Sequence, residues 1–270
     1  MLLTKNLFRK LIVPYLIIAL IWCIMFMVLW AKNGIWESKY WIGYQIGTFI
    51  SPGKSFLQFN SFNEPLWFLL ALAEIKLMAS FLKRTWIMVT VSAICEMAIL
   101  LLSHFGIVLP LAIDSALFAF PFYTIGLLLK DYLLKDYSLF ANILLLLLSF
   151  GLTYLVFCLN GIVDTNHCLY GNNILLYYLG GLTGTLFVAH LSKLIAGYIP
   201  IWTGIYTIVS GAMLIIGFSQ NISSDIRALL PFLGGSNWGG IILGVLTMAV
   251  FYPIIILAKK YFPAILGFRK

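Results

Sequence analysis

Four charged side chains lie inside segments that are otherwise almost wholly apolar: Glu74, Lys76, Glu96 and Asp114. A charged group in the interior of a lipid bilayer is costly, so each of them is a candidate for a functional site. Glu74 and Lys76 are two positions apart and therefore point to different faces of a helix, which prevents them from pairing. Lys76 is close enough to the basic end of its segment to extend its ammonium group toward the headgroups.

Two of the three carboxylates have a structural as well as a functional interpretation. Glu74 lies in the middle of its segment, and it either makes a hydrogen bond between helices or acts in a site as a base. Asp114 precedes Pro121, which frees a backbone carbonyl group; this proline either only bends a helix or lies beside a cavity. Glu96 has no partner that the sequence identifies, and it remains unassigned.

The histidines are His104, His167 and His190, and no two of them have the helical spacing of metal ligands, so no metal site is predicted. His190 lies three residues before Lys193. There it contacts either lipid headgroups or a phosphate-bearing ligand, and it is a second candidate base. His167 belongs to a stretch at 164–173 that is rich in hydrogen-bonding side chains. This stretch is either a solvated loop or part of a binding site.

The composition requires lipid as part of the solvent. Of 270 residues, 62% are apolar and 10% are charged, and the mean hydropathy is +1.03. Soluble domains contain roughly 45–50% apolar and 25% charged residues. The net charge of +8 comes from basic residues in ones and twos between apolar runs, so no nucleic-acid partner is expected. The four cysteines lack CxxC spacing, and neither a disulfide framework nor a metal cluster is predicted.

We expect an all-α, polytopic bundle of about eight transmembrane helices that forms a single integral-membrane domain over 1–270. A bilayer core needs roughly 20 apolar residues for each helix. The candidate segments are 11–31, 65–82, 86–103, 107–129, 139–160, 173–192, 200–218 and 237–258. Between the first two segments, 32–64 is expected to be a long external loop.

The positions of Lys and Arg predict that both termini lie in the cytoplasm. Cytoplasmic loops of membrane proteins collect positive charge. With the N-terminus inside, twelve of the 17 Lys and Arg residues fall in cytoplasmic segments and four in external ones, with Lys76 inside a span. A missed or additional helix would scramble this alternation, so the bias also supports the order of the spans.

Four segments, in this order along the chain, resemble motifs of the acyltransferase 3 family of membrane O-acyltransferases. A basic stretch followed by Leu-Ile-Val-Pro-Tyr occupies 5–15, and Glu-Pro-Leu-Trp-Phe-Leu at 64–69 is similar to the family's Pro-Leu-Trp-Phe-Leu motif. Ala-Phe-Pro-Phe-Tyr-Thr-Ile-Gly at 119–126 is similar to its Pro-Phe-(Phe/Tyr)-x-x-Gly helix. Tyr-Gly-Asn-Asn at 170–173, with the helix that follows it, resembles the family's next loop and helix.

This resemblance implies an O-acyltransferase, most simply an O-acetyltransferase, of the bacterial inner membrane that modifies a cell-surface sugar or polysaccharide. Acetyl-CoA or another acyl-CoA would be the co-substrate, and no bound cofactor is expected. The partners would be membrane lipid, the acyl-CoA, and a surface polysaccharide or lipid-linked sugar. The residues expected to bind the acceptor are Trp67, Asn166, His167, Tyr170 and Asn172, and those on the acyl-donor side are Arg9, Lys10 and Lys193.

The chain departs from the family pattern at its N-terminus. Family members have about ten transmembrane helices, and the first carries an Arg and the His thought to act in catalysis. The first residues here align with the cytoplasmic loop after the second family helix. We therefore expect a domain that is N-terminally truncated relative to the family, without those helices and inactive for that reason, unless Glu74 or His190 serves as the base.

Two other classes of function stay open. A membrane carrier or flippase-like protein for a polysaccharide precursor would use the same buried polar groups along a substrate path. A non-catalytic remnant of the family would need none of them. Transfer of a labelled acetyl group from acetyl-CoA distinguishes an enzyme from both.

Overall fold

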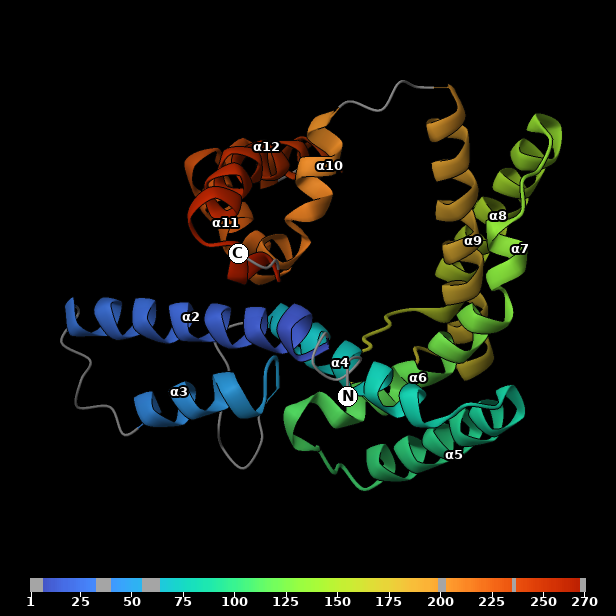
Figure 1. Cartoon of the computed structure of the whole chain (residues 1–270), viewed down its shortest axis with the longest axis horizontal. Coiled ribbons are helices and arrows are strands. Elements are labelled where there is room, and N and C mark those ends of the chain that lie inside the picture. The colour runs from blue at the N-terminus through green and yellow to red at the C-terminus, as the bar shows by residue number, and fades with distance from the viewer. Residues whose placement is uncertain (1–6, 33–39, 55–63, 199–202, 235–236, 268–270) are drawn as a thin grey trace. The chain divides into compact units, whose positions relative to one another are not determined.

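The computed structural model describes residues 7–32, 40–54, 64–198, 203–234 and 237–267 (Figure 1). These ranges are predominantly helical and contain no strand, only an isolated bridge between Asp164 and Leu169. The elements in chain order are η1 (Phe8–Ile12), α2 (Val13–Lys32), α3 (Tyr40–Ile50), η3 (Glu64–Leu66), α4 (Trp67–Phe81), α5 (Thr85–His104), η4 (Pro110–Ala112), α6 (Ile113–Leu128), α7 (Lys130–Leu134), α8 (Leu139–Asn160), α9 (Ile174–Tyr198), α10 (Thr203–Ser210), α11 (Ala212–Leu229), η5 (Pro231–Gly234), α12 (Asn237–Tyr261) and η6 (Pro263–Leu266).

Within the described ranges, six helices are long and apolar enough to cross a membrane: Phe8–Lys32, Thr85–His104, Pro110–Leu128, Leu139–Asn160, Ile174–Gly197 and Trp238–Tyr261. They confirm the expected all-α membrane class. The expected span at 200–218 is instead broken, because α10 and α11 meet at an angle of 85°. If this bent pair counts as one span, the described ranges contain up to seven. The segment at 65–82 forms α4, whose 15 residues are fewer than a span usually needs. The count of eight and the orientation remain predictions.

The chain forms two compact units, and each is described by itself. Unit 1 consists of Met1–Ala73 and Trp202–Lys270, and unit 2 of Glu74–Ile201. The boundary falls inside α4, so its first residues belong to unit 1 and its last to unit 2.

In unit 1, α2 packs closely against α11 around one buried tryptophan. The indole N–H of Trp22 donates to the carbonyl oxygen of Gly217 at 3.1 Å, and its ring stacks on Phe26 and Phe218. Gly217 permits this approach, since a Cβ there would lie 2.8 Å from Cγ2 of Ile18. The bend between α10 and α11 also lies at a glycine, where a Cβ on Gly211 would collide with Ile255.

The segment expected as a long external loop contains a helix that lies beside α2. Tyr15 directs its hydroxyl at the carbonyl oxygen of Phe49, 2.8 Å away, and Gln45 donates to the carbonyl oxygen of Cys23 at 3.2 Å. Toward the other end of α2, Trp30 packs edge-on against Tyr44. These contacts run in opposite order along the two helices, so α3 is antiparallel to α2 (Figure 1). The expectation of a loop was therefore wrong for 40–50, which is helical.

Unit 2 is built from two helix pairs, α5 with α6 and α8 with α9. Each pair is joined by hydroxyl groups: Ser92 and Thr124 are 2.6 Å apart between α5 and α6, and Thr153 donates to Thr183 at 3.1 Å between α8 and α9. Interhelical hydrogen bonds of this kind are typical of membrane bundles. The expected boundary at 104–106 is present as the turn after α5.

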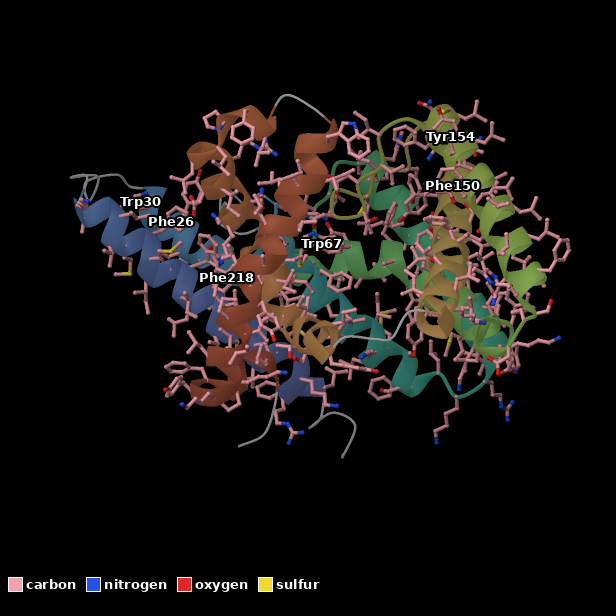
Figure 2. All side chains as sticks on the ribbon, turned by 90° about the horizontal axis from the view of Figure 1, so that it is seen from above. Phe26, Trp30, Trp67, Phe150, Tyr154 and Phe218 are labelled. Carbon is pink, nitrogen blue, oxygen red and sulfur yellow. The ribbon has the colours of Figure 1, made fainter. Side chains whose placement is uncertain are left out.

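Large apolar side chains cover the outer surfaces of the helices (Figure 2). On α8, Phe150, Tyr154 and Phe157 expose 54%, 62% and 74% of their surface. In a soluble protein such rows would cause association, whereas in lipid they face the acyl chains. The surface thus agrees with the composition in placing the helices in a bilayer.

The predicted orientation can be tested with single cysteines at two exposed loop positions, Asn172 and Lys135, in a chain whose own four cysteines are replaced by alanine. A membrane-impermeant maleimide added to intact cells should label the cysteine at 172 and leave the one at 135 unlabelled, because the positive-inside rule places 135 in the cytoplasm. Labelling of 135 alone would reverse the assigned orientation.

The packing of α2 on α11 predicts that Gly217→Val lowers the stability of the protein. The added Cβ would press on Ile18, and overpacking of this kind costs about 1–3 kcal/mol. The melting temperature in detergent should fall relative to the unmodified chain. Gly244→Val on α12 is the matched control, because a Cβ there meets nothing within 4 Å. Equal melting temperatures for the two variants would contradict this packing.

Candidate functional site

The buried carboxylate that the sequence left unassigned has a partner. Tyr178, on α9, donates its hydroxyl to Oε2 of Glu96, on α5. Within the described part of the chain, Oε1 of Glu96 is buried and makes no hydrogen bond, and the hydroxyl of Tyr170, which interacts with Glu96, is likewise buried without one. A buried carboxylate oxygen without a donor is costly, so its position is typical of a group that receives a ligand or a proton. Glu96 is therefore the centre of the candidate site.

Aromatic rings from α6, α9 and the 161–173 loop enclose this pair. Phe118 lies with its ring centre 4.6 Å from that of Tyr170 and 4.8 Å from that of Tyr177, and Phe122 lies 5.0 Å from Tyr178. These spacings are those of favourable aromatic pairs. Burial first, and then the nearby Glu96, raise the pKa of Tyr170 above its ordinary value. Tyr170 is therefore a neutral hydroxyl donor at physiological pH.

The 161–173 loop has a defined turn rather than an open conformation. The backbones of Asp164 and Leu169 exchange two hydrogen bonds, of 3.1 and 2.8 Å. Inside this turn, the carboxylate of Asp164 accepts the backbone N–H of His167 and lies 2.7 Å from its ring Nδ1. Burial opposes ionisation of Asp164, but the hydrogen bonds and charge of His167 outweigh it and lower the pKa of Asp164.

Two buried side chains attach the loop to the helices. Ser115, at the start of α6, donates to the backbone carbonyl of Asn166 at 3.0 Å. At the end of α8, the amide of Asn160 donates to the carbonyl oxygen of Tyr170 at 2.7 Å. Gly171 has a φ of +78°, and a Cβ there would lie 2.2 Å from the carbonyl oxygen of Asn160. Only glycine fits this close approach, which positions Tyr170 over the cluster.

A groove of about 900 Å³ runs along α6, α8 and α9 beside the cluster. Its wall near the loop includes Asn160, Thr165 and Tyr177, and its far end includes Leu129 and Leu133. Because Tyr177 also packs against Tyr178, with ring centres 5.1 Å apart, the groove ends one side chain away from the Glu96–Tyr178 pair. Its volume lies within the range of ligand-binding pockets, roughly 300–1,000 Å³.

A second polar cluster lies nearer the other end of α9. His190 is 2% exposed, and its Nδ1 lies 2.7 Å from the amide oxygen of Asn142 on α8. Lys193 donates to the carbonyl oxygen of Lys135 and lies over the ring of Tyr137, 4.9 Å from its centre. The side chain of His190 is therefore held between the two helices of this pair.

Glu74, the other candidate base, also has a carboxylate oxygen without a partner. Its Oε2 is buried and, among the described groups, makes no hydrogen bond. Asp114, in contrast, accepts the backbone N–H of Ser115 at 2.8 Å and that of Leu109 at 3.3 Å. The carboxylate of Asp114 therefore has donors, whereas the described part of the chain offers none to Oε2 of Glu74.

The structure brings four of the five expected acceptor residues into one loop. Tyr170 faces the cluster and His167 is half exposed, whereas Asn166 is turned inward and Asn172 donates to the carbonyl oxygen of Leu159 at 3.0 Å. The fifth, Trp67, lies in unit 1, where it packs edge-on against Phe68.

The residues expected on the acyl-donor side are divided between the units. Arg9 and Lys10 lie in η1 of unit 1, where Nε of Arg9 is buried and, in the described part of the chain, makes no hydrogen bond. Lys193 lies in unit 2. A role for these three residues in binding the acyl donor therefore remains a prediction from the sequence.

The sequence did not identify Tyr178, Asn142 and Asn160 as partners. The signal for the two asparagines was their position in the apolar segment 139–160, where a carboxamide needs a partner from another helix. Tyr178 gave no signal of its own, because tyrosine is common near membrane interfaces.

Comparison of the chain with known proteins finds no matching family model, no matching curated protein and no matching solved structure. The functional assignment therefore rests on the residues and geometry described above.

The Asp164–His167 pair predicts that the loop loosens in acid. The folded loop lowers the pKa of Asp164, so its stabilising effect is fully present above the unfolded value, near 3.9, and is lost as the pH falls through the lower folded value. Amide exchange at Leu169, corrected for the intrinsic pH dependence, should accelerate across this range. Asp164→Asn should remove the acceleration, and an unchanged profile in that variant would refute the assignment.

Proposed function

We propose that the protein is a membrane O-acyltransferase that transfers an acyl group, most simply acetyl, from acyl-CoA to a sugar hydroxyl. The observation that carries this proposal is the Glu96 carboxylate, which has one oxygen held by Tyr178 and the other buried without a donor among the described groups. Acyl transfer to a hydroxyl requires a base in such a position. The order of motifs along the chain supports the same reaction, with Glu96 as the base in place of Glu74 or His190, the candidates that the sequence suggested.

The proposed reaction uses Glu96 as the proton acceptor. Oε1 of Glu96 removes the proton of the sugar hydroxyl while the oxygen of that hydroxyl attacks the carbonyl carbon of the thioester. A new carbon–oxygen bond forms, the carbon–sulfur bond breaks, and the proton passes to the departing thiolate of CoA. The products are the sugar ester and free CoA. The hydroxyl of Tyr170 is positioned to donate a hydrogen bond within the same cluster.

The second polar cluster suits the donor side of this reaction. The buried His190 and Lys193 lie twelve and fifteen residues after Tyr178 on the same helix. At 1.5 Å per residue, His190 is roughly 18 Å along α9 from Tyr178. A CoA thioester is carried on a long flexible arm, so nucleotide phosphates near Lys193 and an acyl group near Glu96 are compatible with one bound molecule.

The proposal predicts that Glu96→Gln lowers the rate of acyl transfer by about 10²–10⁴-fold, since that is the usual contribution of a general base. The assay is transfer of labelled acetyl from acetyl-CoA to sugar acceptors in membranes that contain the chain, with the protein level measured in parallel. The matched variant is Glu74→Gln, which removes another buried carboxylate and should retain most of the rate.

Loss of transfer in Glu74→Gln with full activity in Glu96→Gln would move the base to Glu74. Absence of transfer by the unmodified chain, with every acyl-CoA and sugar tested, would contradict the enzyme assignment.

A carrier is the second candidate, and the bent helix pair in unit 1 favours it. α10 and α11 meet at 85° at Gly211, and discontinuous helices are common at the substrate sites of transporters. The acyltransferase requires acetyl-CoA as a substrate, whereas the carrier does not. Movement of a labelled sugar lipid between leaflets without acetyl-CoA would support the carrier.

A further inference from the structure

The groove of unit 2 has the length of one lipid chain. Along α9 its wall extends from Leu176 to Leu186, which is roughly 15 Å at 1.5 Å per residue. A bilayer core is about 30 Å thick and contains two leaflets, so one acyl chain extends through about 15 Å. The groove therefore matches the depth of a single leaflet, beginning at the 161–165 end of the loop.

The lining of the groove changes from polar to apolar along this length. Near the loop it offers the amide of Asn160 and the hydroxyls of Thr165 and Tyr177, and beyond them the walls are mainly leucine, isoleucine, valine and phenylalanine. Thr153 and Thr185 also line this part, but their hydroxyls donate to Thr183 and to the carbonyl oxygen of Gly181 within the helix pair. At Gly126, on α6, an added Cβ would meet nothing within 4 Å, so there is open space beside this helix. An amphiphile with a polar head and one hydrocarbon chain fits such a lining.

The polar end is suited to an uncharged head. None of the residues that line the groove is Lys or Arg, and the closest charged side chain in the loop sequence is Asp164, next to Val163 and Thr165. A phosphate head would meet no basic partner there. Amide, hydroxyl and phenol groups instead match the hydroxyls of a sugar, and Tyr177 connects this end to the Glu96 cluster.

We propose that the groove binds the hydrocarbon chain of a glycolipid and presents its uncharged sugar head to the 161–173 loop. This inference rests on the proposed function in one respect, namely that the sugar head is the acyl acceptor. Binding of the glycolipid itself requires neither acyl-CoA nor turnover.

The test uses an alkyl glucoside that carries a diazirine on its chain. The full chain is purified in a detergent without a sugar head and placed in phosphatidylcholine vesicles, and the probe is added and illuminated. Labelled peptides should come from the groove walls at 125–133 and 176–186. Excess unlabelled alkyl glucoside should suppress this labelling, and phosphatidylglycerol should not.

Filling the groove should prevent binding. Gly126→Trp places a ring in the open space beside α6 and should lower labelling by about tenfold, which corresponds to a loss of roughly 1.4 kcal/mol of binding free energy. Gly151→Trp is the matched control, because Gly151 is an exposed glycine of α8 outside the groove and an added Cβ there also meets nothing within 4 Å. Thr185→Trp fills the groove from α9 and provides a second variant should Gly126→Trp fail to fold.

Equal labelling by a photoreactive phosphatidylglycerol, or unchanged labelling in a folded Gly126→Trp or Thr185→Trp variant, would overturn the proposal. The two proposals fail separately. Specific labelling without acyl transfer under any condition would refute the enzyme and leave the glycolipid groove. Acyl transfer with a KM for the alkyl glucoside that neither groove variant changes would refute the groove and leave the enzyme.

Discussion

The hydrogen bond between Tyr178 and Glu96 is the interaction on which the site depends. In the interior of a bilayer no water is available to solvate a carboxylate, so its donors must come from other helices. Tyr178 supplies one such donor and thereby fixes α9 against α5. Oε1 of Glu96 makes no hydrogen bond among the described groups. In surroundings of low dielectric constant, a proton or the hydroxyl of a ligand would bind strongly to this oxygen.

The same constraint explains the rest of unit 2. Ser92 with Thr124, Thr153 with Thr183, and Asn142 with His190 each pair one helix with the next. Small residues let these helices approach, as at Gly181, where a Cβ would lie 2.4 Å from Cε1 of Phe122. Polar pairs and close contacts therefore reinforce each other, because a hydrogen bond between helices forms only where the backbones come near. The loop follows from this packing, since Asn160 and Ser115 attach it to the helix ends.

Much of the helical architecture could be predicted from the sequence, because twenty-residue apolar runs have few other solutions. The sequence did not predict α3, since its aromatic and glycine-rich composition also suits an external loop, and its place beside α2 is visible only from contacts such as those of Tyr15 and Gln45. The bend at Gly211 was missed for a similar reason: glycine is ordinary in membrane helices, and the collision with Ile255 is visible only in three dimensions.

The site was predicted in part. The composition of 164–173 predicted a polar loop. Which of its side chains are buried depends on how the loop packs on α6, as the burial of Asn166 against Ser115 shows. Glu96 was conspicuous as a charge in an apolar run, yet its partner is 82 positions away on another helix. The most direct test of the central claim is the coupling between these two residues in acyl transfer, measured with Glu96→Gln, Tyr178→Phe and the double variant. If the proposed pair acts as one unit, Tyr178→Phe alone lowers the rate of acyl transfer and has little further effect in the Glu96→Gln background; independent, multiplicative losses would contradict the account.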